Sequence, residues 1–197
     1  MKLSPRAKLV LIAAGFVLPM VLSYGAYRFL RPDPTANYGE LLLPPAHVPA
    51  QAFDMGKPGA WRFEDLKGRW ALVISDSGDC PAACVAKLAL LRQVQLALGL
   101  RASRVARVFI VDDPAWPRAP LLAEFEGTVV VATPREARLP PGIGADRSRI
   151  YLVDPNGNVM MRWPSAADPK RLLRDLERLL KASQIGHNDG LFQAALC

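Results

Sequence analysis

Acidic residues are absent from the first 31 positions of the chain, which hold five lysines and arginines. That segment therefore supplies +5 of the formal net charge of +7. Residues 32–197 contain 20 Lys and Arg against 18 Asp and Glu, so their net charge is only +2. They also lack a compact basic stripe interleaved with aromatic side chains, as a phosphate-binding surface would need. The composition thus argues against nucleic-acid binding.

Histidine and cysteine are scarce as well, with two and three copies in 197 residues. The histidines are His47 and His187, and the cysteines are Cys80, Cys84 and Cys197. No internal repeat is apparent. A chain of this length is long enough for one domain and an anchor.

The only long hydrophobic run, Leu9–Tyr27, is uncharged and has about the length that crosses a bilayer as a helix. It contains Pro19, which membrane helices tolerate. A cleaved signal peptide is the alternative, but the run is long for a signal core and no convincing A-x-A site follows it. We interpret residues 9–27 as an uncleaved transmembrane anchor that embeds the chain in the lipid bilayer.

Basic residues flank this anchor on both sides, with three in the predicted cytoplasmic tail, residues 1–8, and two just after the run. Their distribution favours a cytoplasmic N-terminus. The sequence therefore predicts a single-pass protein of the cytoplasmic (inner) membrane, with its C-terminal domain on the periplasmic side. Thiol chemistry is common in such an oxidising compartment.

After the anchor, residues 28–51 are rich in proline and read as a stiff spacer. Residues 52–182 alternate predicted strands and helices, which is an α/β pattern, and residues 183–197 read as a loosely ordered tail. Residues 61–66 are expected to form a short strand or a turn-flanked segment. The other expected strands are 70–75, 104–111, 128–132, 149–153 and 158–163. The expected helices are 81–98, 119–126 and one that begins after Asp168.

The end of this pattern carries the clearest signals. Asn156-Gly157 between two apolar runs predicts a β-hairpin. Asp168-Pro169 predicts a helix start, and leucines at helical spacing follow it.

Of the adjacent Met160 and Met161, one should face the core. Asp112-Asp113-Pro114 follows a buried strand, at the edge where α/β proteins place their sites, although a simple turn is the more ordinary interpretation.

Two of the cysteines, Cys80 and Cys84, lie at a strand-to-helix junction, which is the thioredoxin-like arrangement. With Cys80 as N-cap and Pro81 as first helical residue, Cys84 would lie one turn in on the same face. Backbone N–H groups of the first turn favour a thiolate there, whereas Asp76 and Asp79 oppose it. Such a pair can form an internal disulfide, hold Cu(I), or be structural or inert.

Together with the anchor and the spacer, the strand followed by CPAAC (80–84) and the late IYLVDPNG segment (150–157) resemble the Sco/SenC family. Members of this family are membrane-anchored thioredoxin-like proteins that help to assemble the copper centre of cytochrome c oxidase. The resemblance covers roughly residues 50–182. It implies a thioredoxin-like fold, a cytochrome c oxidase subunit or copper-site assembly protein as partner, and Cys80 and Cys84 as Cu(I) ligands. Val85 stands where the family commonly has proline.

The resemblance also implies a histidine as third copper ligand, five residues before the hairpin tyrosine. That position, counted from Tyr151, is Asp146, and a carboxylate suits Cu(I) poorly. We therefore expect thiol–disulfide redox chemistry, with Cys80 attacking and Cys84 resolving, in preference to Cu(I) carriage. Asp146 could accept a proton near the thiols, but an ordinary loop carboxylate is the simpler interpretation.

Two other functions were considered. A non-enzymatic assembly factor, using the thioredoxin-like fold as a docking surface, is the alternative. A peroxidase of the same superfold is disfavoured because no P-x-x-x-T/S-x-x-C pattern precedes Cys80. Cys197 is expected to be a free surface thiol, and His187 a solvated tail residue rather than a ligand.

Overall fold

The computed structural model describes residues 4–29, 37–48, 51–56, 58–66, 68–133, 139–144 and 146–183. The chain divides into two compact units, Met1–Ala36 and Asn37–Cys197. The tail residues His187 and Cys197 lie outside the described residues, as does most of the predicted tail.

The first unit is a single helix, α1 (Pro5–Phe29), which includes Pro19. Its segment Pro5–Ala26 is long and apolar enough to cross a membrane. The helix contains the whole of the apolar run, Leu9–Tyr27, from which a membrane anchor is predicted.

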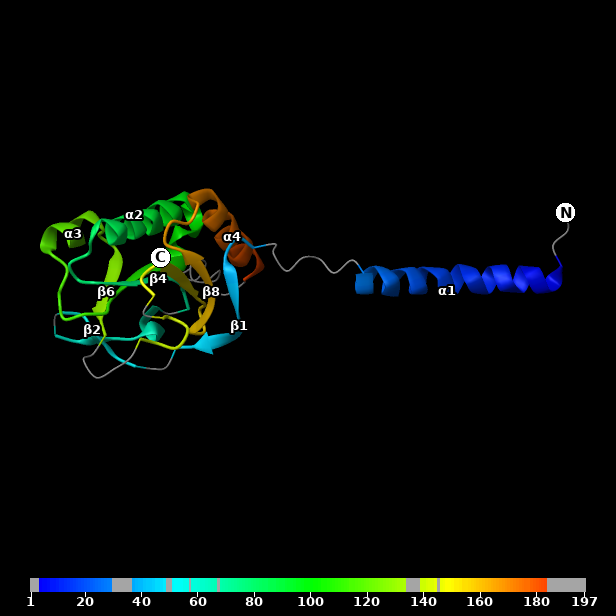
Figure 1. Ribbon diagram of the computed structural model, residues 1–197, viewed down its shortest axis with the longest axis horizontal. Helices are drawn as coiled ribbons and strands as arrows, with labels where there is room; N and C mark the ends of the chain where they lie inside the picture. The colour runs from blue at the N-terminus through cyan, green and yellow to red at the C-terminus, as the bar shows by residue number, and fades with distance from the viewer. Residues whose placement is uncertain are drawn as a thin grey trace, which may run out of the picture. The chain divides into compact units, whose positions relative to one another are not determined.

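The second unit is built on one eight-stranded sheet, with strand order β1-β8-β7-β4-β5-β6-β2-β3 (Figure 1). Strands β4, β5 and β6 are parallel to one another, and the other pairings are antiparallel. The strands are β1 (Glu40–His47), β2 (Phe53–Asp54), β3 (Ala60–Trp61), β4 (Trp70–Asp76), β5 (Val105–Val111), β6 (Thr128–Ala132), β7 (Arg149–Val153) and β8 (Asn158–Pro164). The helices are α2 (Ala82–Ala97), α3 (Ala119–Glu124) and α4 (Pro169–Ala182), with 3-10 turns η1 (Phe63–Leu66) and η2 (Gly99–Arg104).

The spacer prediction is wrong for residues 40–47, because these residues form β1 at the edge of the sheet. β1 pairs with β8, and the carboxylate of Glu40 forms an ion pair with Arg162 at 2.6 Å. The register shifts between Leu41 and Ala46, the stretch that contains both prolines of the strand. Proline cannot donate to a β-ladder, so it is tolerated on an edge strand where pairing is interrupted. The α/β domain therefore begins earlier than residue 52.

The predicted segment 61–66 is not one strand, since only Trp61 belongs to β3 and Phe63–Leu66 is the 3-10 turn η1. The rings of Trp61, Phe63 and Phe53 pack together in tilted and edge-to-face contacts, with centroids 4.9–5.9 Å apart. Aromatic clustering of this kind buries a large apolar area within a short piece of chain. It covers one face of the sheet, against Val73, Val108 and other strand residues.

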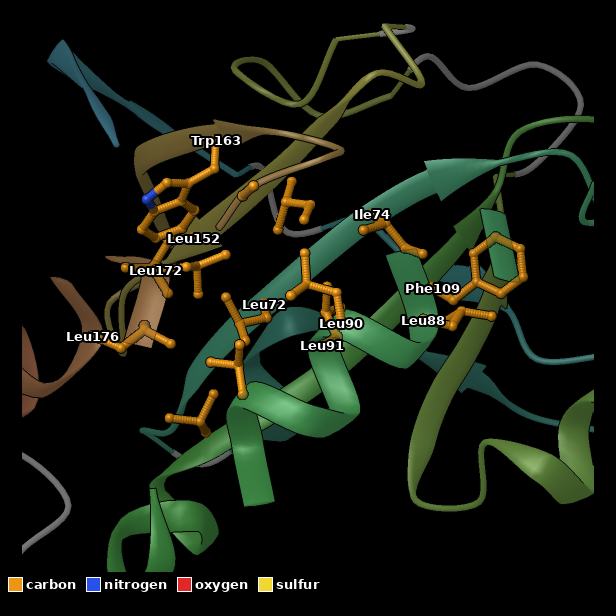
Figure 2. Packing of buried hydrophobic residues seen from close by; sticks show 14 of the residues in the cluster. Leu72, Ile74, Leu88, Leu90, Leu91, Phe109, Leu152, Trp163, Leu172 and Leu176 are labelled. Carbon is orange, nitrogen blue, oxygen red and sulfur yellow. The ribbon is translucent and has the colours of Figure 1, made fainter. Parts of the chain in front are cut away.

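The opposite face of the sheet is covered by α2 and α4 (Figure 2). Leu88 and Leu91 of α2 and Leu172 and Leu176 of α4 are all buried against Leu72, Ile74 and neighbouring strand residues, as predicted from the helical spacing. Strands β4 and β5 are buried along their whole length because both faces of the sheet are covered. Met161 faces this core at 1% exposure, whereas Met160 is only partly buried.

The late hairpin and the last helix form as predicted. The N–H of Asp154 donates to the carbonyl of Asn158, and the N–H of Asn158 donates to the carboxylate of Asp154. Gly157 has a φ of 81°, a conformation that favours glycine. Asp168 caps α4, since its side chain accepts a bond from the backbone N–H of Arg171 at 2.8 Å.

A buried carboxylate attaches the start of the domain to α4. Asp175 accepts bonds from the backbone N–H groups of Tyr38 and Gly39 and from the indole N–H of Trp163, at 3.2, 2.8 and 3.1 Å. The guanidinium of Arg171 lies 4.1 Å from the Tyr38 ring centroid, a cation–π contact. The first residues of the second unit are therefore held against α4.

Candidate functional site

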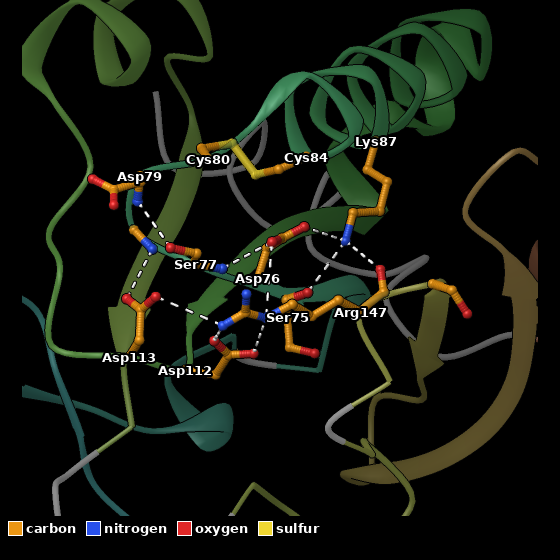
Figure 3. A network of polar contacts seen from close by, with 12 residues as sticks. Ser75, Asp76, Ser77, Asp79, Cys80, Cys84, Lys87, Asp112, Asp113 and Arg147 are labelled. Carbon is orange, nitrogen blue, oxygen red and sulfur yellow. Dashed lines mark hydrogen bonds and ion pairs between the residues drawn. A yellow bond between two sulfur atoms is a disulfide. The ribbon is translucent and has the colours of Figure 1, made fainter.

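Cys80 and Cys84 form a disulfide where β4 leads into α2, with Cα atoms 5.1 Å apart (Figure 3). Because β4 and β5 are parallel, the residues that follow them meet at the same edge of the sheet. The two cysteines therefore lie beside the segment that follows β5, Asp112–Asp113. The pairing is one of the arrangements that the four-residue spacing allows.

The helix begins one residue later than predicted. Pro81, not Cys80, is the N-cap residue, and Ala82 is the first residue of α2. Cys80 has a φ of 41°, in the left-handed region, and its N–H donates to the carbonyl of Ser77. Cys80 thus belongs to a tight turn before the helix. The ring of Pro81 cannot accept a hydrogen bond, so no side chain caps the helix. The N–H groups of the first turn therefore point towards the turn that contains Cys80.

The two cysteines differ in exposure. Cys80 retains 6% of its surface exposed, whereas Cys84 is fully buried. An incoming thiol would therefore reach the disulfide from the side of Cys80. Both cysteines are buried, and the roles of Cys80 as the attacking and Cys84 as the resolving cysteine stay a prediction.

A buried ion pair lies one turn along α2 from Cys84. The Nζ atom of Lys87 is 2.6 Å from Oδ2 of Asp76, and the side-chain exposures are 1% and 5%. Lys87 also donates to the carbonyl oxygens of Ser75 and Arg147, at 3.2 and 2.6 Å. The negative charge of Asp76, which was expected to oppose a thiolate, is therefore paired with a cation inside the domain.

Arg147 joins this pair to the segment after β5. Its guanidinium donates two bonds to Asp112, at 3.0 and 2.5 Å, and lies 3.6 Å from Asp113 and 3.9 Å from Asp76. The bond to Asp112 is the main reason why the pKa of Arg147 is raised. Asp112 and Asp113 are thus more than a turn, since they connect three loops at the edge that carries the disulfide (Figure 3).

Asp113 holds the turn that precedes Cys80. Its carboxylate accepts bonds from the N–H groups of Gly78 and Ala115 at 3.0 and 3.1 Å, and the Ser77 hydroxyl bonds to it. The pKa of Asp113 is lowered, chiefly by the Ser77 hydroxyl and then by these backbone groups and Arg147. A Cβ atom at Gly78 would overlap the carbonyl group of Ala115. The two loops touch so closely that only glycine fits.

Asp146, the position that the family resemblance assigns to a third ligand, is exposed and bound to its own loop. Its carboxylate accepts bonds from the N–H and hydroxyl of Ser148, at 2.9 and 2.5 Å, and from Arg149 at 3.4 Å. The bonds to Ser148 are the main reason why the pKa of Asp146 is lowered. Tyr151 holds this loop, because its hydroxyl accepts a bond from the N–H of Gly144 at 3.2 Å. These contacts describe an ordinary loop carboxylate.

The residues around the disulfide offer only part of a copper site. Among the residues that the structure describes, no group of three or more His, Cys, Asp and Glu side chains is placed to hold a metal ion. Reduced Cys80 and Cys84 would offer two sulfur ligands. The nearby ammonium of Lys87 is a cation and cannot serve as a ligand in that form. His47 is on β1, where its ring bonds to Asn158.

Comparison with known proteins places the domain in a family. Residues 70–183 match the model of the "transmembrane-like, thioredoxin-like, C-terminal domain" family. The chain belongs to this family. No curated protein sequence matches it.

Several solved structures have a fold similar to that of this chain. Apo Sco1 of Thermus thermophilus is similar with a TM-score of 0.59 and 18% identity, over 75% of this chain and 99% of that one. Yeast Sco1 with copper bound has a TM-score of 0.54 and 18% identity, over 71% and 92%. BsSco, a Sco-family cytochrome c oxidase assembly protein with a disulfide switch, has a TM-score of 0.51 and 16% identity, over 68% and 93%. The thioredoxin-like fold shared with Sco proteins is therefore confirmed.

Sequence reasoning missed Lys87 and Arg147. A signal for Lys87 was present, since positions 84, 87, 88 and 91 share one helical face and three of them are Cys or Leu. A lysine on that buried face needs an anion inside the domain. Arg147 carried no comparable signal, because its carboxylate partners lie 34 or more residues away along the chain.

Proposed function

We propose that this protein is a membrane-anchored thiol–disulfide exchange protein that uses Cys80 and Cys84 during assembly of the copper centre of cytochrome c oxidase. The Cys80–Cys84 disulfide at the start of α2, with Cys80 on its accessible side, is the observation that carries the proposal. The pathway is suggested by the fold it shares with BsSco, which belongs to a family of cytochrome c oxidase assembly proteins.

The expected reaction keeps the cysteines of a partner's copper site reduced. The Cys80 thiolate attacks one sulfur of the partner's disulfide, and the other partner cysteine leaves as a thiolate that takes up a proton. The Cys84 thiolate then attacks the sulfur of Cys80 in the mixed disulfide and releases the second partner thiol. Two electrons and two protons reach the partner, and a dithiol reductant must later reduce the Cys80–Cys84 disulfide.

The surroundings of the pair support this chemistry. The N-terminus of α2 favours a thiolate at the turn before it. Lys87 pairs with the buried Asp76 and so removes a negative charge that would oppose a thiolate. Asp113 and Gly78 fix the turn that carries Cys80 against the loop after β5.

The anchor and location follow from α1. Its apolar length and the basic residues around it favour a single span with the domain on the periplasmic side of the inner membrane. Disulfides form and persist in such an oxidising compartment, so a partner's cysteines need a reductant there.

Copper as cargo is the weaker form of the proposal. Yeast Sco1 binds copper, and reduced Cys80 and Cys84 could offer Cu(I) two sulfur atoms. The described residues add no third ligand, so no step of the mechanism is routed through copper. A docking factor that needs neither thiol remains the alternative from a different class.

The test uses the full chain in lipid nanodiscs, in a Cys197→Ser background that leaves only the pair. Equilibration in glutathione redox buffers, followed by alkylation and gel shift, should give a reversible two-electron transition, which Cys80→Ser abolishes. Anaerobic Cu(I) titration against a competing chelator measures the copper form, and tight stoichiometric binding would contradict the preference for redox chemistry. An organism that carries Cys80→Ser/Cys84→Ser and still assembles active oxidase would favour the docking factor.

A further inference from the structure

The helical face of the domain is strongly basic, although the domain as a whole is nearly neutral. Residues 81–104, which include α2 and η2, hold four Lys and Arg and no Asp or Glu. Residues 169–182, which form α4, hold five Lys and Arg and two acids. Together these segments carry a net charge of +7, whereas residues 32–197 as a whole carry +2, so the remainder of residues 32–197 is net −5. The charge of the domain is therefore polarised.

Most of this positive charge is on the surface. Only Lys87 among the nine cations is buried, and it is paired with Asp76. Of the two acids in α4, Asp175 is buried and Glu177 is exposed. Arg104 is partly buried and donates to backbone carbonyls, so the outer sides of α2, η2 and α4 present seven exposed cationic side chains and one exposed anionic side chain. We call this surface the basic helical face.

Two large apolar side chains lie among these cations. Leu96 is 65% exposed and Leu100 is fully exposed, both at the end of the α2–η2 segment. That end lies next to the end of α4, since Arg104 donates to the carbonyl oxygens of Leu180 and Ser183 at 2.9 Å. Exposed leucines surrounded by Lys and Arg are typical of surfaces that lie against anionic lipid headgroups.

The chain that leads from α1 enters the domain at this face. Asp175 and Arg171 of α4 hold Tyr38 and Gly39, the first residues before β1. Seven residues, 30–36, separate the end of α1 from Asn37, a length of chain that reaches at most about 25 Å when extended. A tether of this length keeps a membrane within reach of α4, if α1 is the anchor proposed above.

From these observations we infer that the basic helical face of α2, η2 and α4 docks on the anionic lipid surface of the membrane in which the protein is anchored. The inference rests on the anchor in the proposed function. The N-terminal end of α2 follows Cys80, and its C-terminal end leads to the exposed Leu96 and Leu100. The disulfide end of the sheet carries Asp79, Asp112 and Asp113, the last two around Arg147, so these four side chains are net negative. Anionic lipid repels that end, so docking turns the disulfide away from the bilayer and towards a partner in the aqueous phase.

The test places an environment-sensitive fluorophore at Leu100→Cys in the full chain, in a Cys197→Ser background with the Cys80–Cys84 disulfide kept oxidised. The protein is reconstituted into vesicles of phosphatidylcholine alone, or with 30% phosphatidylglycerol, that contain nitroxide-labelled lipid. We expect quenching by the nitroxide only with phosphatidylglycerol, and its loss in 0.5 M salt. A fluorophore at Glu64→Cys, on an exposed site of the turn that covers the other face of the sheet, is the matched control and should not be quenched.

Charge variants complete the test. Arg101→Gln/Lys181→Gln should lower the docking equilibrium constant by on the order of tenfold, because each basic residue near an anionic surface adds to its attraction. Arg62→Gln/Arg69→Gln removes the same charge from exposed positions beside η1, on the other face of the sheet, and should leave quenching unchanged. Vesicles that float with the protein while Leu100→Cys stays unquenched would overturn docking and leave the anchor standing. A protein that floats with neither kind of vesicle would overturn both the docking and the membrane anchor. The redox titration of Cys80 and Cys84 is independent of either outcome.

Discussion

The ammonium of Lys87 lies 2.6 Å from the carboxylate of Asp76, inside the domain and one helical turn from the buried Cys84. Both partners are almost fully buried, and Lys87 also holds two backbone carbonyls, one on β4 and one in the loop before β7. Because a buried ion pair costs desolvation, its value depends on both partners being present. The domain thus buries a charged pair one helical turn from its disulfide, at a place where an apolar pair would cost less to bury.

Lys87→Met should destabilise the domain by about 3–5 kcal/mol, because it leaves the Asp76 carboxylate buried without its partner. Urea denaturation of the full chain in detergent, followed by tryptophan fluorescence, measures the loss. Lys181→Met, which removes an exposed lysine from the end of α4, is the control and should cost less than about 1 kcal/mol. Asp76→Asn/Lys87→Met should recover much of the stability, and a double variant no more stable than Lys87→Met alone would contradict the pairing.

Exposure predicts which cysteine exchanges with an external thiol. In Cys84→Ser the remaining Cys80 should form a mixed disulfide with oxidised glutathione at least about ten times faster than Cys84 does in Cys80→Ser, because Cys84 is fully buried. Mass spectrometry of samples quenched with acid follows both reactions in the Cys197→Ser background. Equal rates in the two variants would show that Cys80 has no special role.

Gly78→Ala should disturb the turn that carries Cys80, because the new methyl group would overlap the carbonyl of Ala115. We expect a loss of about 1–3 kcal/mol in stability, together with a changed rate of disulfide reduction by dithiothreitol. Gly144→Ala is the matched control, since its nearest neighbours are 3.5 and 3.7 Å away and the substitution should be close to neutral. An unchanged Gly78→Ala protein would mean that the two loops separate at little cost.

The stability of the domain should depend on pH through Asp113. Its pKa is lower in the folded state than the unfolded value of about 3.9, so it stabilises the fold above that pH. This contribution is lost as the pH falls below about 4 and through the folded pKa. Asp113→Asn should therefore be less stable than the natural protein at pH 7, and the difference should shrink towards pH 2.5. Urea denaturation midpoints of both proteins, measured from pH 7 to pH 2.5, test this prediction. If the difference in stability between the two proteins did not change with pH, the effect would come from lost hydrogen bonds and not from the charge of Asp113.

Local signals in the sequence predict most of the fold correctly. Strands β6 and β7 form over the residues expected for them, and β4, β5 and β8 differ from expectation by one residue at an end. The Asn156-Gly157 hairpin and the Asp168 cap also form as predicted, because hairpin turns and helix caps depend on a few neighbouring residues. The two cysteines could be placed at a strand-to-helix junction for the same reason.

Contacts between distant segments could not be predicted in this way. Residues 40–47 read as a proline-rich spacer, and they become β1 only because the edge of β8 offers unpaired backbone groups. The same limit applies to Arg147, which the chain brings against Asp112 over 35 positions. Cys80 was expected to cap α2, but its position outside the helix depends on the turn that Gly78 and Asp113 hold in place.

The sequence by itself determined the apolar helix, the order of strands and helices from β4 onwards, and the thiol pair at the start of α2, because periodicity, turn residues and caps act over short stretches of chain. Only the tertiary structure decided how that pair is surrounded. Burial forces Lys87 onto Asp76, the parallel strands bring Asp113 beside Gly78, and α2 and α4 combine their cations into one face. Electrostatic and packing energies depend on distances in space, which no local pattern specifies.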